Sequence, residues 1–401
     1  MPNGGGNWQG DVLRDLRGTG GQAPVPGQAP VPVPGQTPVP AQAPAPGPAP
    51  VPTQASAPAP AQPAPVQAPA PHPVPPQPYE QQQPPASPYA QPAPRTPDSR
   101  QVLDGELAAA RRKARHGEAF VTRALRAVRR TVSSSAAREV ADAKRLGELL
   151  QAPVTTGRQI AVTSIRGGAG KSTVSALLGT TYAHYRHDPV LLVEADPALG
   201  TLPLRVGAEA LRWTTGDLAS IVVPQMSLLD VTGYLVQLPD NAWLLPGSQG
   251  QIGAMLDLKA YEKVMVSLRR YFGITVVDCE TLPAEVARTA LSAAQARVLV
   301  APATLEGVTS TYSVLQWMRQ LPPHMIEGTV VVLTETVPHS GLDLGKATAK
   351  LKATGVKVQL LPYDRHLASG GAIRTELLAQ PTRTAATRLA AEVFQLSQQR
   401  R

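Results

Sequence analysis

Short runs of aliphatic and β-branched residues recur through residues 151–401, and each run is followed by polar residues, glycine or proline. These runs cover 159–164, 190–193, 274–278, 296–301, 329–333 and 358–361. A short apolar run of this kind is typical of a strand that is buried on both faces of a parallel sheet. Helices are expected between the runs, over 174–184 and from about Thr309 to Gln320. The pattern predicts a doubly wound, mostly parallel α/β sheet with its functional site at the carboxyl ends of the strands.

Residues 1–100 lack this pattern, because they hold 29 of the 43 prolines in the chain. From Gln22 to Pro97 the sequence is almost entirely Pro, Ala, Gln and Val with glycine spacers. Proline fixes φ and has no N–H to donate, so neither a helix nor a sheet ladder is expected here. We expect a disordered arm of extended polyproline II character. It serves either as a spacer or as the ligand of a protein that binds proline-rich chains.

Residues 101–150 form a basic segment between the arm and the domain predicted over 151–401. Val121, Leu125, Val128 and Val132 lie on one face of a predicted helix, with arginines in the remaining directions. A second helix is predicted over Ala136–Leu150. Residues 105–131 are thus a candidate contact for an anionic membrane or DNA, or for the chain's own domain.

The net charge of +9 consists of +5 on residues 101–150 and +4 on residues 151–401. The single cysteine, Cys279, rules out a disulfide-stapled module. No apolar run approaches the roughly 20 residues that a membrane-spanning helix needs. The first six residues have neither a basic nor an apolar signal region. The expected location is cytoplasmic, with peripheral membrane contact through the basic segment as an option.

The strongest motif follows the first apolar run, where a glycine-rich stretch leads from a predicted strand into a predicted helix. Its residues are Ile165, Arg166, Gly167, Gly168, Ala169, Gly170, Lys171, Ser172 and Thr173. Glycines allow backbone N–H groups to surround phosphate oxygens at a helix N-terminus. Lys171 is expected to contact the β- and γ-phosphates, and the Ser172 hydroxyl to ligate Mg²⁺. Residues 167–173 are therefore the predicted nucleotide site.

This loop departs from the usual phosphate-binding pattern, because Ile165 stands where the first glycine is expected. It resembles the variant loop [KR]-G-G-x-G-K-[ST]-[ST] of the MinD/ParA group of P-loop ATPases, called the deviant Walker A motif. The resemblance implies that ATP and Mg²⁺ bind and that an ATP-dependent homodimer forms. In that family a lysine at the first motif position crosses the dimer to the partner's phosphates. Arg166 occupies that position here and is also cationic.

Further motifs of the family follow in order. Asp196, in Glu194-Ala195-Asp196-Pro197, resembles the acid that orients the attacking water, and Asp278 resembles the Walker B acid that holds Mg²⁺. Thr334 stands where relatives commonly place an adenine-reading Asn. Pro362 and Asp364 match a loop that packs on the adenine. The resemblance thus implies that Asp196, Lys171 and Arg166 act in catalysis, and that Ser172 and Asp278 bind the metal.

The function this predicts is an ATP-dependent switch that dimerises, hydrolyses ATP slowly and drives positioning, partitioning or secretion-associated processes. The proline-rich arm, basic helix and ATPase together resemble the MinD-like ATPases of type VII secretion in actinobacteria. Two alternatives are a nucleotide-binding scaffold with little turnover and a DNA partition module that uses the basic helix. One cysteine cannot supply the paired ligands that the iron–sulfur relatives need. In the terminal helix, Leu389, Val393, Phe394 and Leu396 are expected either to close the core or to target a membrane.

Overall fold

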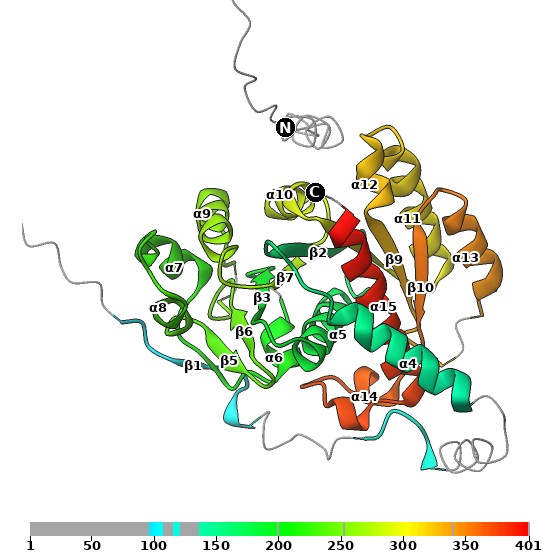
Figure 1. Cartoon of the computed structure of the whole chain (residues 1–401), viewed down its shortest axis with the longest axis horizontal. Coiled ribbons are helices and arrows are strands. Elements are labelled where there is room, and N and C mark those ends of the chain that lie inside the picture. Colours follow the sequence, from blue (N-terminus) through cyan, green and yellow to red (C-terminus); the bar gives the residue numbers. More distant parts are fainter. Residues whose placement is uncertain are drawn as a thin grey trace, which may run out of the picture. The chain divides into compact units, whose positions relative to one another are not determined.

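A mostly parallel sheet organises the part of the chain that the computed structural model describes (Figure 1). That part is residues 96–106, 115–120, 136–198, 200–251, 253–338 and 341–399, without the side chains of Ala136 and Glu139. Eight described strands form the sheet in the order β10-β9-β8-β2-β7-β3-β6-β5. The strands are β2 (Arg158–Ser164), β3 (Val190–Ala195), β5 (Val236–Leu238), β6 (Ala242–Leu245), β7 (Ile274–Cys279), β8 (Ala296–Pro302), β9 (Thr329–Thr334) and β10 (Lys357–Leu361). Within this sheet the described strands pair in parallel, except that β5 is antiparallel to β6.

Helices cover both faces of this sheet (Figure 1). One face packs against α4 (Ala136–Leu150), α5 (Lys171–Tyr185), α6 (Leu202–Val206), α14 (Arg365–Ala368) and α15 (Gln380–Gln399). The other packs against α7 (Thr215–Ile221), α8 (Leu228–Thr232), α9 (Leu258–Leu268), α10 (Glu285–Ala293), α11 (Leu305–Met318) and α13 (Leu344–Lys352), with α12 (Pro323–Glu327) beside α11. Alternate strand residues serve the two cores: Ile160 points to the first and Ala161 to the second. The predicted fold class is therefore confirmed.

The strands follow the apolar runs closely, while the predicted bounds of two helices are wrong. Helix α5 begins at Lys171, before the predicted start at Val174, because Gly170 is already its N-cap. Helix α11 begins at Leu305 and ends at Met318, rather than running from Thr309 to Gln320. The start moves because the Thr304 hydroxyl accepts a hydrogen bond of 3.1 Å from the N–H of Gly307, which caps the helix there. In α15, the predicted apolar residues Leu389, Val393, Phe394 and Leu396 are all buried. The terminal helix thus closes the core.

Helix α4 has the predicted bounds and packs against α5 and α15. The buried Arg186, which follows α5, donates hydrogen bonds to the carbonyls of Leu150 and Ala152 at the end of α4. Its guanidinium also pairs with Asp188 at 2.8 Å and lies over the Phe394 ring. Cations at a helix carboxyl end stabilise it. Arg186 therefore fixes residues 136–150 to the sheet layers.

The chain also contacts the domain at two points before α4. β1 (Arg100–Gln101) pairs antiparallel with β4 (Ala210–Leu211). The N–H of Gly117 donates to the carbonyl of Leu377, the last residue of the short helical turn η1 (Thr375–Leu377). Residues 1–95 of the predicted arm (1–100) and the arginine-rich stretch 121–132 lie outside the described residues. Among those described, no helix combines the length and the hydropathy that a membrane span requires.

Candidate functional site

The glycine-rich loop joins the carboxyl end of β2 to the first residue of α5. Gly168 and Gly170 have φ values of +73° and +93°, a region that residues with a side chain rarely adopt. Gly170 is the N-cap of α5, and no side chain caps that helix. The N–H groups of its first turn are therefore available to an anion, and the helix dipole favours negative charge there.

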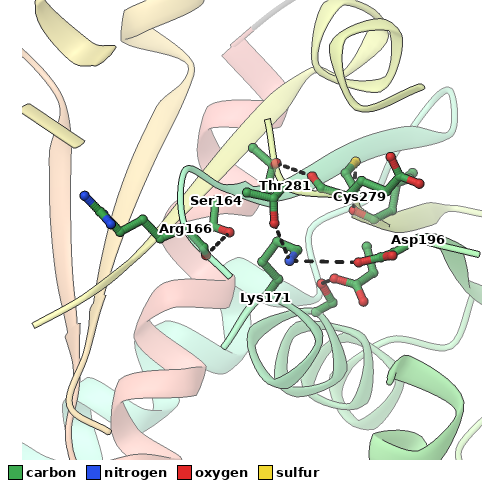
Figure 2. A network of polar contacts seen from close by, with 11 residues as sticks. Ser164, Arg166, Lys171, Asp196, Cys279 and Thr281 are labelled. Carbon is green, nitrogen blue, oxygen red and sulfur yellow. Dashed lines mark hydrogen bonds and ion pairs between the residues drawn. The ribbon is translucent and has the colours of Figure 1, made fainter. Parts of the chain in front are cut away.

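Lys171 and Asp196 lie on neighbouring elements with their charged groups directed toward each other (Figure 2). The Lys171 Nζ is 4.0 Å from Asp196 Oδ2 and donates a 3.1 Å hydrogen bond to the Thr281 hydroxyl. Both charged side chains are largely buried, with 11% of Lys171 and 18% of Asp196 exposed. The structure thus brings together the predicted phosphate-binding lysine and the predicted catalytic acid.

Asp278 is the next-to-last residue of β7, the strand next to β2, and it is completely buried. Its Oδ1 accepts a 2.9 Å hydrogen bond from the Ser175 hydroxyl. Its Oδ2 has no partner of normal hydrogen-bond geometry among the described residues. Burial raises the pKa of Asp278 to about 6, against the lowering effect of the Ser172 and Ser175 hydroxyls and of Lys171. A buried carboxylate oxygen without a partner beside Ser172 suits a hard cation such as Mg²⁺.

Glu194 pairs in register with Asp278 across β3 and β7 and is also buried. Its Oε2 accepts a 3.2 Å hydrogen bond from the N–H of Gly247. Burial raises its pKa to about 8, and the nearby Asp278 and Asp196 add to that rise. A glutamate in such surroundings holds its proton near neutral pH. The cluster of Glu194, Asp196 and Asp278 therefore carries less negative charge than three ionised carboxylates would.

Arg166 extends away from Lys171 (Figure 2). Its Nε donates a 3.1 Å hydrogen bond to the hydroxyl of Ser310 on α11. The main chain of Arg166 is held in place, because the buried Ser164 hydroxyl donates a 2.8 Å hydrogen bond to the Arg166 carbonyl. The cation of Arg166 is thus presented at the surface beside the loop.

The residues predicted to contact the adenine lie on the other side of the loop, at the ends of β9 and β10. The buried Thr334 hydroxyl donates a 2.8 Å hydrogen bond to the carbonyl of Ala169, within the phosphate-binding loop. Asp364 is only 2% exposed, and its carboxylate accepts from the N–H groups of His366, Leu367 and Ala379. Pro362 lies between β10 and Asp364. The Thr334 hydroxyl and the Asp364 carboxylate therefore already have hydrogen-bond partners within the protein.

Three contact residues of the site are absent from the sequence-based prediction: Ser175, Thr281 and Gly247. Ser175 follows Ser172 by one helical turn, so a second hydroxyl at that spacing is the signal that could have found it. Thr281 follows β7, the strand that carries Asp278. The residue before Thr281 is held by the Thr163 hydroxyl, which donates a 2.8 Å hydrogen bond to the Glu280 carbonyl. Gly247 follows a buried strand that the apolar runs did not identify.

These residues fit a magnesium nucleotide in two respects. The uncapped start of α5 and Lys171 suit phosphate oxygens, and the Asp278 Oδ2 atom with the Ser172 hydroxyl suits a divalent cation. Within the described part of the chain, no group of three or more His, Cys, Asp or Glu residues is arranged to hold a metal ion. The cation would thus take further oxygen ligands from phosphate and water.

Comparison with known sequences identifies relatives but no matching family model. The ESX-1 secretion-associated protein EspI of Mycobacterium tuberculosis is 27% identical over 227 residues, which cover 55% of this chain and 34% of that protein. The septum site-determining protein MinD of Bacillus subtilis is 24% identical over 202 residues, covering 47% of this chain and 74% of MinD. An ATP-binding protein of Methanocaldococcus jannaschii is 22% identical over 220 residues, covering 55% of this chain and 79% of that protein. The chain thus spans about a third of the length of the EspI sequence that it matches.

Solved structures with similar folds include a ParA family ATPase from Chlorobium tepidum and the cell division ATPase MinD from Pyrococcus furiosus. The first has a TM-score of 0.48 and 13% identity, covering 58% of this chain and 98% of that structure. The second has a TM-score of 0.45 and 22% identity, covering 60% of this chain and 99% of that structure. The sequence relatives confirm the resemblance to MinD/ParA-like P-loop ATPases that the motifs indicated.

Proposed function

We propose that this protein binds ATP with Mg²⁺ at residues 167–173 and hydrolyses it slowly. The observation that carries the proposal is the convergence of Lys171, Asp196 and Asp278 at the uncapped start of α5. A phosphate-binding cation, an acid beside it and a buried carboxylate are the groups that phosphoryl transfer to water requires. The sequence similarity to an ATP-binding protein and to MinD supports the same chemistry.

Each residue has a distinct role in this proposal. Lys171 exchanges its contacts with Thr281 and Asp196 for the β- and γ-phosphate oxygens, and the first-turn N–H groups of α5 bind the same phosphates. Asp196 accepts a hydrogen bond from the attacking water and orients it in line with the scissile bond. Ser172 and Asp278 hold Mg²⁺, which neutralises charge that develops on the phosphates when it is bound.

Hydrolysis is proposed to act as a timer on a homodimer that forms with ATP. Arg166 is directed away from its own Lys171 and contacts Ser310 on α11, so its cation is available to a second copy of the chain. Leu305, at the start of α11, is 68% exposed. An exposed apolar side chain near a surface cation fits a nucleotide-dependent contact between two copies. Arg166 would then reach the partner's phosphates, as the family resemblance implies.

The biological setting that we propose is a secretion-associated or cell-positioning process. The relative at 27% identity carries the name of an ESX-1 secretion-associated protein, and MinD that of a septum site-determining protein. An ATP-driven switch suits either setting, because nucleotide state can control dimerisation and thereby the binding of a partner protein. The proline-rich arm is the proposed contact for such a partner.

Two substitutions test this function in the full chain. Lys171→Ala should weaken ATP binding by about 100-fold or more, because the phosphate charge loses its buried cation. Asp196→Ala should keep ATP binding, abolish turnover and accumulate an ATP-bound dimer. Calorimetry, phosphate release and light scattering measure these three properties. Asp142→Ala, on the exposed surface of α4, is the control. Tight ATP binding without turnover in the unmodified protein, or normal turnover in Asp196→Ala, would contradict the proposal.

A further inference from the structure

The turn formed by residues 246–250, which follows β6, supports the main chain around Asp196. Because β6 pairs with β3, the carboxyl ends of these two parallel strands adjoin. The Ser248 hydroxyl donates a hydrogen bond to the Pro197 carbonyl, and the N–H of Gly247 donates to the Glu194 carboxylate at 3.2 Å. The residues on both sides of Asp196 in the chain are therefore bonded to the 246–250 turn.

The 246–250 turn is itself fixed by buried contacts. The N–H and the hydroxyl of the buried Thr215 both donate to the Pro246 carbonyl, at 2.9 Å and 3.1 Å. Ser248 is only 6% exposed and also accepts a 2.9 Å hydrogen bond from the N–H of Gly250. A Cβ atom on Gly247 would lie 2.7 Å from the Glu194 carbonyl oxygen, so this close approach requires glycine. A turn fixed in this way can hold the main chain around Asp196 in one position.

The outer side of the same turn binds the segment Asp98–Val102. The Gln249 amide donates to the Asp98 carbonyl at 2.9 Å and to the Arg212 carbonyl at 2.8 Å. This segment continues into β1, and the N–H of Val102 donates to the Glu209 carbonyl at 2.9 Å. One turn thus contacts the Asp196 region through Gly247 and Ser248, and the segment that leads to the N-terminus through Gln249.

We infer that the 246–250 turn positions Asp196 for catalysis and couples it to the segment Asp98–Val102. The inference rests on the proposed ATP hydrolysis at Asp196. Ser248 is a positioning residue, since it acts on Asp196 through the Pro197 carbonyl to which it donates. Gln249 joins the same turn to Asp98. A partner that bound the proline-rich arm and displaced Asp98 would change the hydrolysis rate through this turn.

Ser248→Ala in the full chain tests the positioning role. We expect kcat for ATP to fall about tenfold while KM changes less than about twofold, because the water-orienting acid is misplaced and the phosphate contacts remain. Ser248→Thr, which keeps the hydroxyl, should restore most of the rate. Ser397→Ala removes a buried hydroxyl that bonds only within α15 and should leave kcat unchanged. An unchanged kcat in Ser248→Ala, or equal losses for Ala and Thr, would overturn the role.

Gln249→Ala tests the coupling by hydrogen exchange without nucleotide. The reporter is the N–H of Gly200, which bonds to the Asp196 carbonyl at 2.9 Å. We expect faster exchange at both Val102 and Gly200, and a loss of about threefold in kcat. Gln320→Ala, at an exposed position after α11, should change neither. Faster exchange at Val102 with no change at Gly200 or in kcat would show that the two regions are independent.

These experiments distinguish a failure of this inference from a failure of the proposed function. If the unmodified protein does not hydrolyse ATP, the proposed function fails, whereas the exchange rates at Gly200 still decide whether the 246–250 turn holds the Asp196 region. If the protein hydrolyses ATP and Asp196→Ala abolishes turnover, but the Ser248 and Gln249 variants behave as their controls do, only the inference fails.

Discussion

On the β7–β3 side of the phosphate-binding loop, polar atoms face the site with few internal partners, whereas on the β9–β10 side they are bonded to the backbone. Among the described residues, Asp278 keeps one oxygen without a hydrogen-bond partner of normal geometry, and the Lys171 ammonium contacts the side chains of Thr281 and Asp196, which can release it. Asp364, in contrast, accepts three backbone hydrogen bonds. A motif match alone does not separate these cases, because both sets of residues lie at the predicted strand ends. The remaining hydrogen-bonding capacity of each group distinguishes the residues proposed to bind a ligand from those that already have partners within the protein.

The largest expected effect concerns the structural side. Asp364→Ala removes the acceptor of three buried N–H groups, and we expect a loss of about 3–4 kcal/mol in the free energy of unfolding. Chemical denaturation measures the loss, and calorimetry on the folded fraction should give an ATP affinity within about twofold of the unmodified protein. Asp343→Ala removes a half-exposed cap of α13 and should cost about 1 kcal/mol. A stable Asp364→Ala protein with weak ATP binding would place Asp364 among the ligand contacts.

The next-largest effect concerns Glu194, a buried acid on the β7–β3 side of the loop. The pKa of Glu194 is raised to about 8 by burial, so the folded protein holds a proton that the unfolded chain releases near pH 4.5. This proton therefore stabilises the fold fully at acid pH, and the stabilisation declines as pH rises from about 4.5 to about 8. Glu194→Gln keeps an acceptor for Gly247 and carries no charge.

We expect Glu194→Gln to be more stable than the unmodified protein at pH 8.5, on the order of 3 kcal/mol, with the difference vanishing near pH 5. Denaturation curves at several pH values, without nucleotide or metal, provide the measurement. Glu148→Gln, which alters an exposed glutamate of α4, should show no such pH dependence. A constant difference across the whole pH range would mean that Glu194 is ionised in the folded protein.

The smallest effect concerns Thr334, which joins the two sides by bonding to the loop carbonyl of Ala169. Thr334→Val keeps the side-chain volume but leaves that buried carbonyl without its donor, at a cost of about 1 kcal/mol. We expect ATP affinity to fall only a few-fold, and Thr334→Ser to restore both properties. Thermal denaturation and calorimetry measure them. A loss of ATP affinity far beyond the loss of stability would indicate a direct contact of Thr334 with the nucleotide.

Much of the fold and of the loop follows from local sequence. The apolar runs predict the strands because parallel strands buried on both faces are continuously hydrophobic, and Lys171 and Asp278 stand next to such runs. The region 206–272 was not predicted, because its strands β5 and β6 are only three and four residues long. The raised pKa of Glu194 and the contacts of Ser248 arise between segments distant in sequence. No local pattern encodes them.

The segment before the sheet domain contacts that domain at β1, at Gly117 and again at α4. Anything that binds the chain between Gly117 and α4 is therefore held within a limited distance of the domain. Residues 121–135 join two described segments, so their fully extended span is at most about 55 Å. A surface or molecule that engaged the arginines of this stretch would remain within that radius of the sheet domain. Its effective concentration at the domain would be on the order of millimolar, as for a short tether. Weak contacts between that ligand and the sheet domain would then be sufficient for joint binding.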